Sequence, residues 1–338
     1  MRKKNSITIA EIAKKAGVSR TTVSFYLNEK FEKMSSKTRQ KIQDVIEETE
    51  FVPNAMARSL NDKQSHLVGT IVQANENTAK TEFLDGVRSH LQKNGYQMIA
   101  AVTSYGLEEE RETIEQMSRL NVDGIIINPS ESFDLLWSTM KKNIPLVAYN
   151  PPHVSRYAAW VRSNDYEVVY TTLEKEASTG YSRFVLVSEE ADKCNGIPQR
   201  VLAFDHVMRY RHLERKDLYV NDIKNTEDLE FRLLQEIRID QKTCFFVTTP
   251  ALLDKVYLIL RDYHELIPEH IGLLGFDSQE WVHMVAPSVT TIVQPVFEEG
   301  VHAAKLLLDQ IEGRNEELPN QIFSCVLQEA DTTMKVPD

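Results

Sequence analysis

A short polar stretch near the N-terminus carries side chains that suit contacts with DNA bases. Residues 19–25 read Ser-Arg-Thr-Thr-Val-Ser-Phe. Arg20 has the donors for a bidentate contact with guanine, and Thr21 can hydrogen-bond a base or touch a thymine methyl group. Thr22 and Ser24 can reach a phosphate or a base edge. A capped, solvated helix start would contain the same residue types, so the neighbouring elements must decide between the two interpretations.

The residues around this stretch predict short helices joined by a tight turn. Thr8 and Glu11 have the spacing of a capping box, whose side chains satisfy free backbone donors at a helix start. Gly17 suits the left-handed conformation that ends a helix, and Ser19 is a new N-cap. The apolar positions of the first two helices, and of a third that opens at residue 35 or 36, are Ile9, Ile12, Ala13, Ala16, Val23, Leu27, Ile42, Val45 and Ile46. This is the helix-turn-helix pattern, whose second helix enters the major groove of DNA.

The distribution of charge separates this part from the rest of the chain. The 338 residues carry 39 Lys+Arg and 50 Asp+Glu, and a formal net charge of −11 argues against nucleic acid for the chain as a whole. Residues 1–63 alone carry 13 basic and 8 acidic residues, a net charge of +5, and the remainder has a net charge of −16. A basic head on an acidic body favours nucleic-acid binding at one end only.

Composition excludes several kinds of protein and site. No run approaches the ~18 apolar residues that span a membrane, and the basic N-terminus does not lead into the apolar block of a signal peptide. The three cysteines, Cys194, Cys244 and Cys325, form no CxxC pair, which fits a reducing cytoplasm better than a disulfide framework or a zinc site. The nine histidines show no metal-binding spacing. We therefore expect a cytoplasmic protein with no membrane span, metal or cofactor.

A resemblance to a known family supports the DNA-binding interpretation. The segments that carry it are residues 9–24, Thr38-Arg39 and the run Pro53-Asn54-Ala55-Met56-Ala57-Arg58-Ser59-Leu60. They resemble the N-terminal signature of the lactose/galactose-repressor family of bacterial transcription regulators. The loop at residues 28–35 is most similar to the fructose- and sucrose-repressor branch of that family.

The resemblance implies base contacts from Arg20, Thr21 and the position of Phe25. Many members have Arg at that position. A Phe cannot hydrogen-bond a base, so it should read DNA by apolar contact or pack beside the backbone, and the operator sequence cannot be copied from relatives. Residues 54–60 look like the family's hinge helix, in which Leu60 would wedge into the central base step; an ordinary interdomain linker is the alternative. The DNA-binding residues that we predict are Thr8, Ser19, Arg20, Thr21, Thr22, Ser24, Phe25, Asn28, Asn54, Ala57, Arg58 and Leu60.

From residue 64 onward, short apolar runs alternate with amphipathic stretches. The predicted strands are residues 67–72, 97–102, 124–127, 145–148, 184–187, 244–247, 271–276 and 289–293. The predicted helices are residues 83–93, 108–119, 165–178, 201–211, 228–237 and 252–263. This alternation predicts doubly wound parallel sheets in two lobes, with ligands bound at the carboxyl ends of strands.

The resemblance extends more loosely into this body, through residues 122–127, 144–147, 272–277 and 289–292. It implies the fold of periplasmic sugar-binding proteins, in which three crossovers join two lobes and the effector occupies the cleft. On that basis Arg200 and Asp277 make the polar effector contacts, facing each other across the cleft to grip vicinal hydroxyls, or a phosphate in the case of Arg200. Asn75, Asn150 and Thr249 are further candidates.

Two departures and two local alternatives bear on this site. Relatives often have Ala-Asn-Asp after the eighth strand, where this chain has Thr248-Thr249-Pro250. They also have Asn-Pro-Phe-Phe after the first strand, where this chain has Asn75-Glu76-Asn77-Thr78. Both changes alter the polar groups offered to an effector. Arg200 could instead pair locally, and Asp277 could cap the turn that follows it.

The predicted fold is α/β: a small all-α helix-turn-helix head at residues 1–52, a hinge helix and linker at 53–65, and a two-lobed, doubly wound parallel-sheet effector domain at 66–338. The N-lobe would span about 66–162 and 292–325, and the C-lobe about 163–291.

The predicted function is a repressor of a carbohydrate-utilisation operon that binds double-stranded operator DNA and is controlled by a small sugar or sugar phosphate. It would act as a homodimer, or a tetramer, on two operator half-sites. One alternative is a regulator that senses a non-sugar metabolite such as a nucleoside or base. The other is a sugar-acting α/β enzyme, against which the chain has no phosphate-loop or nucleophile-elbow motif.

Overall fold

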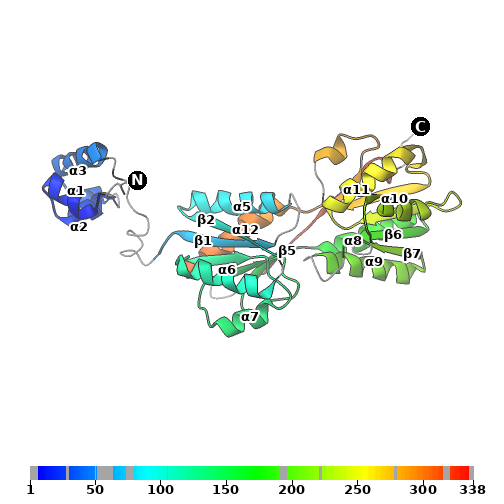
Figure 1. The fold of residues 1–338 in the computed structure, drawn as a ribbon, viewed down its shortest axis with the longest axis horizontal. Helices are drawn as coiled ribbons and strands as arrows, with labels where there is room; N and C mark the ends of the chain where they lie inside the picture. The colour runs from blue at the N-terminus through cyan, green and yellow to red at the C-terminus, as the bar shows by residue number, and fades with distance from the viewer. Residues whose placement is uncertain are drawn as a thin grey trace. The chain divides into compact units, whose positions relative to one another are not determined.

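The computed structural model divides into two compact units, Met1–Ser65 and His66–Asp338, which we call the head and the body (Figure 1). The structure describes residues 7–27, 30–49, 51, 64–73, 79–104, 106–189, 196–220, 223–277, 280–314 and 320–334. Each unit has its own buried apolar core. The two units are therefore described separately.

Three helices form the head: α1 (Ile9–Ala16), α2 (Arg20–Leu27) and α3 (Ser36–Thr49), with a 3-10 turn η1 (Phe31–Lys33) between the last two. Both halves of the capping box are present, since the Thr8 side chain accepts from the Glu11 amide and the Glu11 side chain accepts from the Thr8 amide. Gly17 ends α1 with a φ of 64°, in the left-handed region. The buried core residues are Ile12, Ala13, Ala16, Val23, Ile42 and Val45. The predicted helix-turn-helix is confirmed.

The N-lobe of the body is a six-stranded parallel sheet in the order β11-β5-β4-β3-β1-β2. Its strands are β1 (Leu67–Gln73), β2 (Gln97–Thr103), β3 (Gly124–Ile127), β4 (Leu146–Tyr149), β5 (Ala159–Ser163) and β11 (Gln321–Phe323). Helices α5 (Ala79–Lys93) and α12 (Val296–Ile311) cover one face, and α6 (Leu107–Arg119) and α7 (Phe133–Met140) cover the other (Figure 1). Because a Cβ at Gly86 or Gly300 would lie 2.1 or 2.2 Å from a carbonyl oxygen of the facing helix, α5 and α12 pack backbone against backbone.

The C-lobe is a second six-stranded sheet, in the order β12-β10-β9-β8-β6-β7, in which only β12 is antiparallel to its neighbour. Its strands are β6 (Arg183–Ser188), β7 (Glu214–Tyr219), β8 (Thr243–Val247), β9 (Ile271–Phe276), β10 (Thr290–Val293) and β12 (Val326–Gln328). Helices α8 (Asp165–Ser178) and α9 (Ile197–Arg211) cover one face, and α10 (Thr226–Gln235) and α11 (Pro250–Leu260) cover the other. Two 3-10 segments, η3 (Arg261–Leu266) and η4 (Glu280–His283), complete this lobe.

The chain passes between the lobes three times. The crossovers are Asn164, between β5 and α8; residues 294–295, between β10 and α12; and residues 324–325, between β11 and β12. Two predicted lobe boundaries differ from this arrangement, because residue 163 still belongs to β5 and residue 292 lies within β10. Both strands end at the crossover itself, so the apolar pattern alone did not mark where the lobe changes.

All eight predicted strands and all six predicted body helices are present, with small shifts at their ends. The sequence interpretation missed β5, β7, β11, β12, α7 and α12. β7 has the sequence Glu-Arg-Lys-Asp-Leu-Tyr and buries only Leu218, because it lies at the edge of its sheet and lacks an apolar run. None of the described helices is long and apolar enough to span a membrane.

Candidate functional site

The exposed face of α2 presents the side chains that the sequence assigns to DNA. Ser19 caps the helix: its hydroxyl accepts from the Thr22 amide at 3.1 Å and lies 2.8 Å from the Thr22 hydroxyl. Arg20 and Thr21 are exposed, Val23 is buried in the core, and Ser24 is half-buried. Among the described residues, the side chains of Arg20, Thr21 and Ser24 have no hydrogen-bond partner, so their polar groups are free to meet DNA.

Two other predicted contacts are already engaged within the head. The Thr8 hydroxyl donates to Glu11 Oε2 at 3.0 Å, and these bonds, led by the one from the Thr8 amide, hold the pKa of Glu11 below its ordinary value. Phe25 is half-buried, and the Lys33 ammonium lies 4.8 Å from the centre of its ring. This cation on an aromatic face places a positive charge beside Phe25.

The remaining DNA-binding candidates lie outside the described residues. They are Asn28, Asn54, Ala57, Arg58 and Leu60. The effector candidate Asn75 also lies outside the described residues. The hinge assignment of residues 54–60 therefore stays a prediction.

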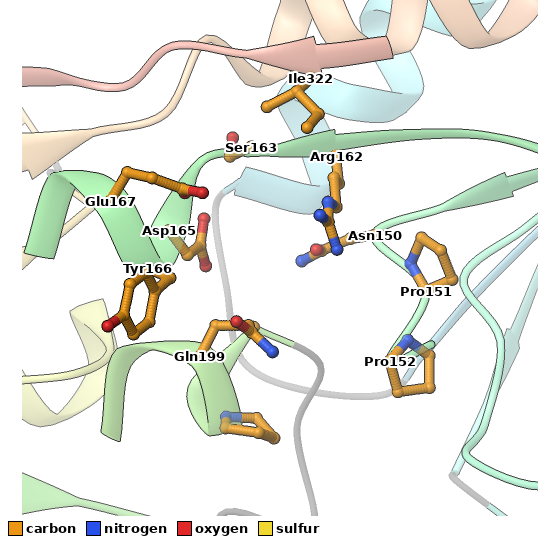
Figure 2. A pocket seen from close by; sticks show the side chains of 12 residues that line it. Asn150, Pro151, Pro152, Arg162, Ser163, Asp165, Tyr166, Glu167, Gln199 and Ile322 are labelled. Carbon is orange, nitrogen blue, oxygen red and sulfur yellow. The ribbon is translucent and has the colours of Figure 1, made fainter. Parts of the chain in front are cut away.

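The body contains a polar cavity of about 110 Å³ where the two lobes meet (Figure 2). The N-lobe lining consists of Asn150, Pro151, Pro152, Arg162, Ser163 and Ile322, and the C-lobe lining consists of Asp165, Tyr166, Glu167, Gly196, Pro198 and Gln199. Both lobes thus contribute directly to its walls, next to the first crossover.

Arg200 lies behind this cavity in a buried polar network. Its Nε donates to Asp165 Oδ2 at 3.0 Å, one terminal nitrogen donates to the Thr248 carbonyl at 2.6 Å, and the other donates to Gln294 Oε1 at 3.4 Å. Gln294 in turn donates to Asp165 Oδ1 at 3.1 Å, and the guanidinium stacks 3.5 Å from the centre of the Phe276 ring. Each nitrogen of the Arg200 guanidinium therefore donates to a neighbouring group, and two of the three acceptors, Asp165 and Gln294, lie beside the crossovers.

The predicted opposition of Arg200 and Asp277 across the cleft is wrong. Both residues belong to the C-lobe, Arg200 on α9 and Asp277 directly after β9, and the carboxylate paired with Arg200 is Asp165. The local-pairing alternative for Arg200 describes its geometry. Sequence alone could not supply this partner, because residue 165 follows the first crossover and lies 35 positions away.

The other three described effector candidates lie at the carboxyl ends of strands. Asn150 lines the cavity and Asp277 is 6% exposed, and both have left-handed backbones, with φ of 45° and 61°. Burial raises the pKa of Asp277 to about 7, although the Arg200 guanidinium opposes that rise. Asp277 Oδ2 and Thr249 Oγ1 are buried and have no hydrogen-bond partner in the described part of the chain. Such unsatisfied acceptors are costly unless a ligand or water supplies a donor.

Comparisons with known proteins agree with this two-part architecture. Residues 8–54 match the family described as bacterial regulatory proteins, lacI family, and residues 174–333 match the periplasmic binding protein-like domain. The HTH-type transcriptional regulator KdgR of Bacillus subtilis is 28% identical over 319 residues, which cover 93% of this chain and 94% of KdgR. The chain therefore combines a LacI-family DNA-binding domain with a periplasmic-binding-protein-like domain, and its homologues are LacI-family regulators.

Other relatives and solved structures also match over more than nine-tenths of the chain. The HTH-type transcriptional repressor PurR of Vibrio vulnificus is 26% identical over 314 residues, which cover 92% of this chain and 93% of PurR. The Lac repressor dimer bound to operator and an anti-inducer covers 98% of this chain with a TM-score of 0.84 and 18% identity, over 100% of its own length. The structure of the transcriptional regulator CelR in complex with cellobiose matches 96% of this chain and 99% of the CelR chain, with a TM-score of 0.66 and 19% identity. The protein is a DNA-binding transcription regulator and not an enzyme.

The sequence analysis did not identify several buried polar residues of the body. Glu299, in the first turn of α12, is fully buried and accepts from the Ser163 hydroxyl at 2.5 Å. Burial raises its pKa to about 8, and the nearby Asp165 and Asp277 add to that rise. Ser163, Asp165, Gln294 and Glu299 flank the first two crossovers, so buried polar contacts link the strands at which the lobes are joined. The one available signal was the placement of polar residues directly after apolar strands.

Proposed function

We propose that the protein is a repressor of carbohydrate-utilisation genes that acts in the cytoplasm as a homodimer. Each head would place α2 in the major groove of one operator half-site, with Arg20 and Thr21 toward the bases. The free polar groups on the exposed face of α2 support this assignment. The positive charge of residues 1–63 favours phosphate contacts, so operator affinity should fall steeply with added salt.

The effector that we propose is a small sugar or sugar phosphate bound in the cavity between the lobes. The observation that carries this proposal is that both lobes supply polar groups to one cavity, including Asn150 from the N-lobe and Gln199 from the C-lobe. The cavity has room for on the order of ten water molecules, which suits a single sugar. The related CelR structure is a complex with cellobiose.

The mechanism follows from the position of the cavity. A ligand that contacts both lobes binds one lobe arrangement more tightly than another, and it shifts the equilibrium only by that difference in affinity. The change would be transmitted to residues 54–60, where the Leu60 of each subunit would enter the central base step of the operator. Two apolar wedges offset the cost of unstacking by bending the DNA toward further protein contacts.

Two substitutions test the separation of DNA binding from effector binding. Leu60→Ala should weaken operator binding while leaving effector binding intact, and unchanged operator affinity would exclude the wedge. Asn150→Ala should weaken the response to effector while keeping basal operator affinity, because its amide lines the cavity in the body. Fluorescence anisotropy of labelled operator, with and without a candidate sugar, measures both effects. A fully responsive Asn150→Ala protein would remove this cavity from the proposal.

A further inference from the structure

We propose that the effector carries an anionic group, a carboxylate or a phosphate, and that Arg162 binds it. This inference rests on the proposed effector site between the lobes. It adds a residue that the family resemblance did not single out, and it narrows the chemical class of the ligand.

Arg162 presents an uncompensated positive charge to the cavity. It is the fourth of the five residues of β5, is half-buried, and lines the cavity from the N-lobe side. Figure 2 shows its guanidinium beside Asn150, pointing into the cavity. The Trp160 ring, 4.8 Å away, supports the guanidinium from the side. Among the described residues, no carboxylate forms an ion pair with Arg162, although many other arginines of the body have one.

The two carboxylates that line the same cavity do not fill this role. Asp165 lines the cavity, but its two carboxylate oxygens already accept from Arg200 and Gln294. Glu167 is an exposed residue in the first turn of α8, so water screens its charge. Burial raises the pKa of Asp165, and the positive charges of Arg200 and Arg162 oppose that rise. Neither Arg162 nor Glu167 has an ion pair among the described residues, and Arg162 is the less exposed of the two, so it gains more from a ligand of opposite charge.

The C-lobe wall, which also contains Asp165 and Glu167, adds a partial positive charge at the start of α9. Helix α9 begins at Ile197, and Gly196 and Pro198 at its start both line the cavity. Pro198 has no N–H, and the amides of Gln199 and Arg200 donate to the Gly196 carbonyl, so what this end of the helix offers an anion is the partial positive charge of the helix start. A Cβ at Gly196 would lie 2.8 Å from Asp165 Oδ2 and 3.3 Å from Asn150 Nδ2, so a side chain here would fill the space beside these polar groups. The partial positive charge at the start of a 15-residue helix adds to that of Arg162.

An anionic group between Arg162 and the start of α9 would contact both lobes at once. A guanidinium holds a carboxylate or phosphate through two parallel hydrogen bonds, which are stronger than bonds between neutral groups. A neutral sugar would leave the half-buried guanidinium without a counter-ion. The cavity should therefore discriminate between an acidic sugar and its neutral parent, and the hydroxyl contacts would be made by residues such as Asn150 and Gln199.

The test is a binding series with the whole protein and matched compounds. Thermal shift and titration calorimetry would compare glucose, galactose and fructose with gluconate, galacturonate, glucose 6-phosphate and fructose 1-phosphate. At least one of the anions should bind, and Arg162→Gln should weaken that binding about 10- to 100-fold. Arg162→Lys, which keeps the charge but not the planar fork, should retain part of the affinity. Comparison of the two carboxylates with the two phosphates shows which anionic group the cavity binds.

Arg209→Gln is the matched control, because Arg209 lies on α9 with a side chain 77% exposed and does not line the cavity. It should bind the anion like the wild-type protein. Binding of neutral sugars only, binding of none of the anions, or anion binding that Arg162→Gln leaves unchanged would each overturn the proposal. Operator affinity without ligand, measured for the wild-type protein and for Arg209→Gln, reports on the repressor function separately.

Discussion

The functional polar side chains are exposed in the head but buried around the cavity of the body. In the head, the predicted DNA-contacting groups of Arg20 and Thr21 are exposed, and the contacts that build the unit lie within about forty residues of sequence. In the cleft, Asp165, Arg200 and Glu299 are each at most 4% exposed and come from three separate segments. The head can therefore change its recognition residues at little structural cost, whereas a change beside the cleft disturbs a buried network.

This difference predicts how substitutions in the two regions divide between stability and binding. A change on the face of α2 should alter DNA affinity without changing the free energy of unfolding. A change in the buried network should alter the stability of the body first. All three tryptophans, Trp137, Trp160 and Trp281, lie in the body, so tryptophan fluorescence follows the unfolding of that unit alone.

The largest expected effect is that of Arg200→Met. Removing the guanidinium leaves the buried Asp165 carboxylate without its ion-pair partner and with the hydrogen bond from Gln294, which should lower the unfolding free energy of the body by about 3–5 kcal/mol. Urea denaturation followed by tryptophan fluorescence measures this change, with Arg209→Gln as the exposed control. A loss below about 1 kcal/mol would mean that the Arg200–Asp165 pair behaves as a surface ion pair. Substitutions beside the cavity would then cost no more stability than those on the exposed face of α2.

Glu299→Gln should change the pH dependence of body stability. Burial raises the pKa of Glu299 from 4.5 to about 8, so the folded protein keeps a proton that the unfolded chain has released between these values. The stabilisation is complete below about pH 4.5 and is lost as the pH rises toward 8, by up to about 1.4 kcal/mol per pH unit. The Gln variant lacks this contribution, and its stability should decline less steeply in that range.

Urea titrations at several pH values measure the slopes. Asp277 has a pKa raised to about 7, also by burial, so part of the decline should persist in the Glu299→Gln protein. Identical slopes for the variant and the wild-type protein would show that Glu299 is ionised in the folded state.

Arg20→Ala should weaken binding to the operator by about 1–3 kcal/mol, because a bidentate contact with a base edge is lost. Since Arg20 is exposed and unpaired within the described head, the stability of the head should not change. Anisotropy with operator and with unrelated DNA separates base recognition from phosphate contact. An equal loss on both DNAs would assign Arg20 to the backbone instead.

Thr8→Ala should have the smallest effect, a loss of about 1 kcal/mol of head stability. The substitution removes the side-chain half of the capping box at the start of α1. Amide hydrogen exchange in α1 would increase, while the tryptophan-monitored unfolding of the body would not move. Unchanged exchange in α1 would show that the box contributes nothing measurable.

The contrast between the two regions also determines what could be predicted from the sequence. The helices of the head follow from local signals such as the Thr8–Glu11 box and Gly17, and the buried strands of the body follow from their apolar runs. The edge strand β7 escaped notice because its residues are mostly charged. The partner of Arg200 and the role of Arg162 depend on which strand ends the crossovers bring together. No local pattern encodes that proximity.

The most direct test of the account is the operator affinity of the whole protein with and without a compound that binds the body. Operator DNA would be selected from a random pool, and a compound that stabilises the body in the matched sugar series would then be titrated into the complex. We predict that the compound changes the operator affinity of the wild-type protein by about tenfold or more, and that this change is absent in the Arg162→Gln protein. A compound that binds the cavity and leaves operator affinity unchanged would contradict it.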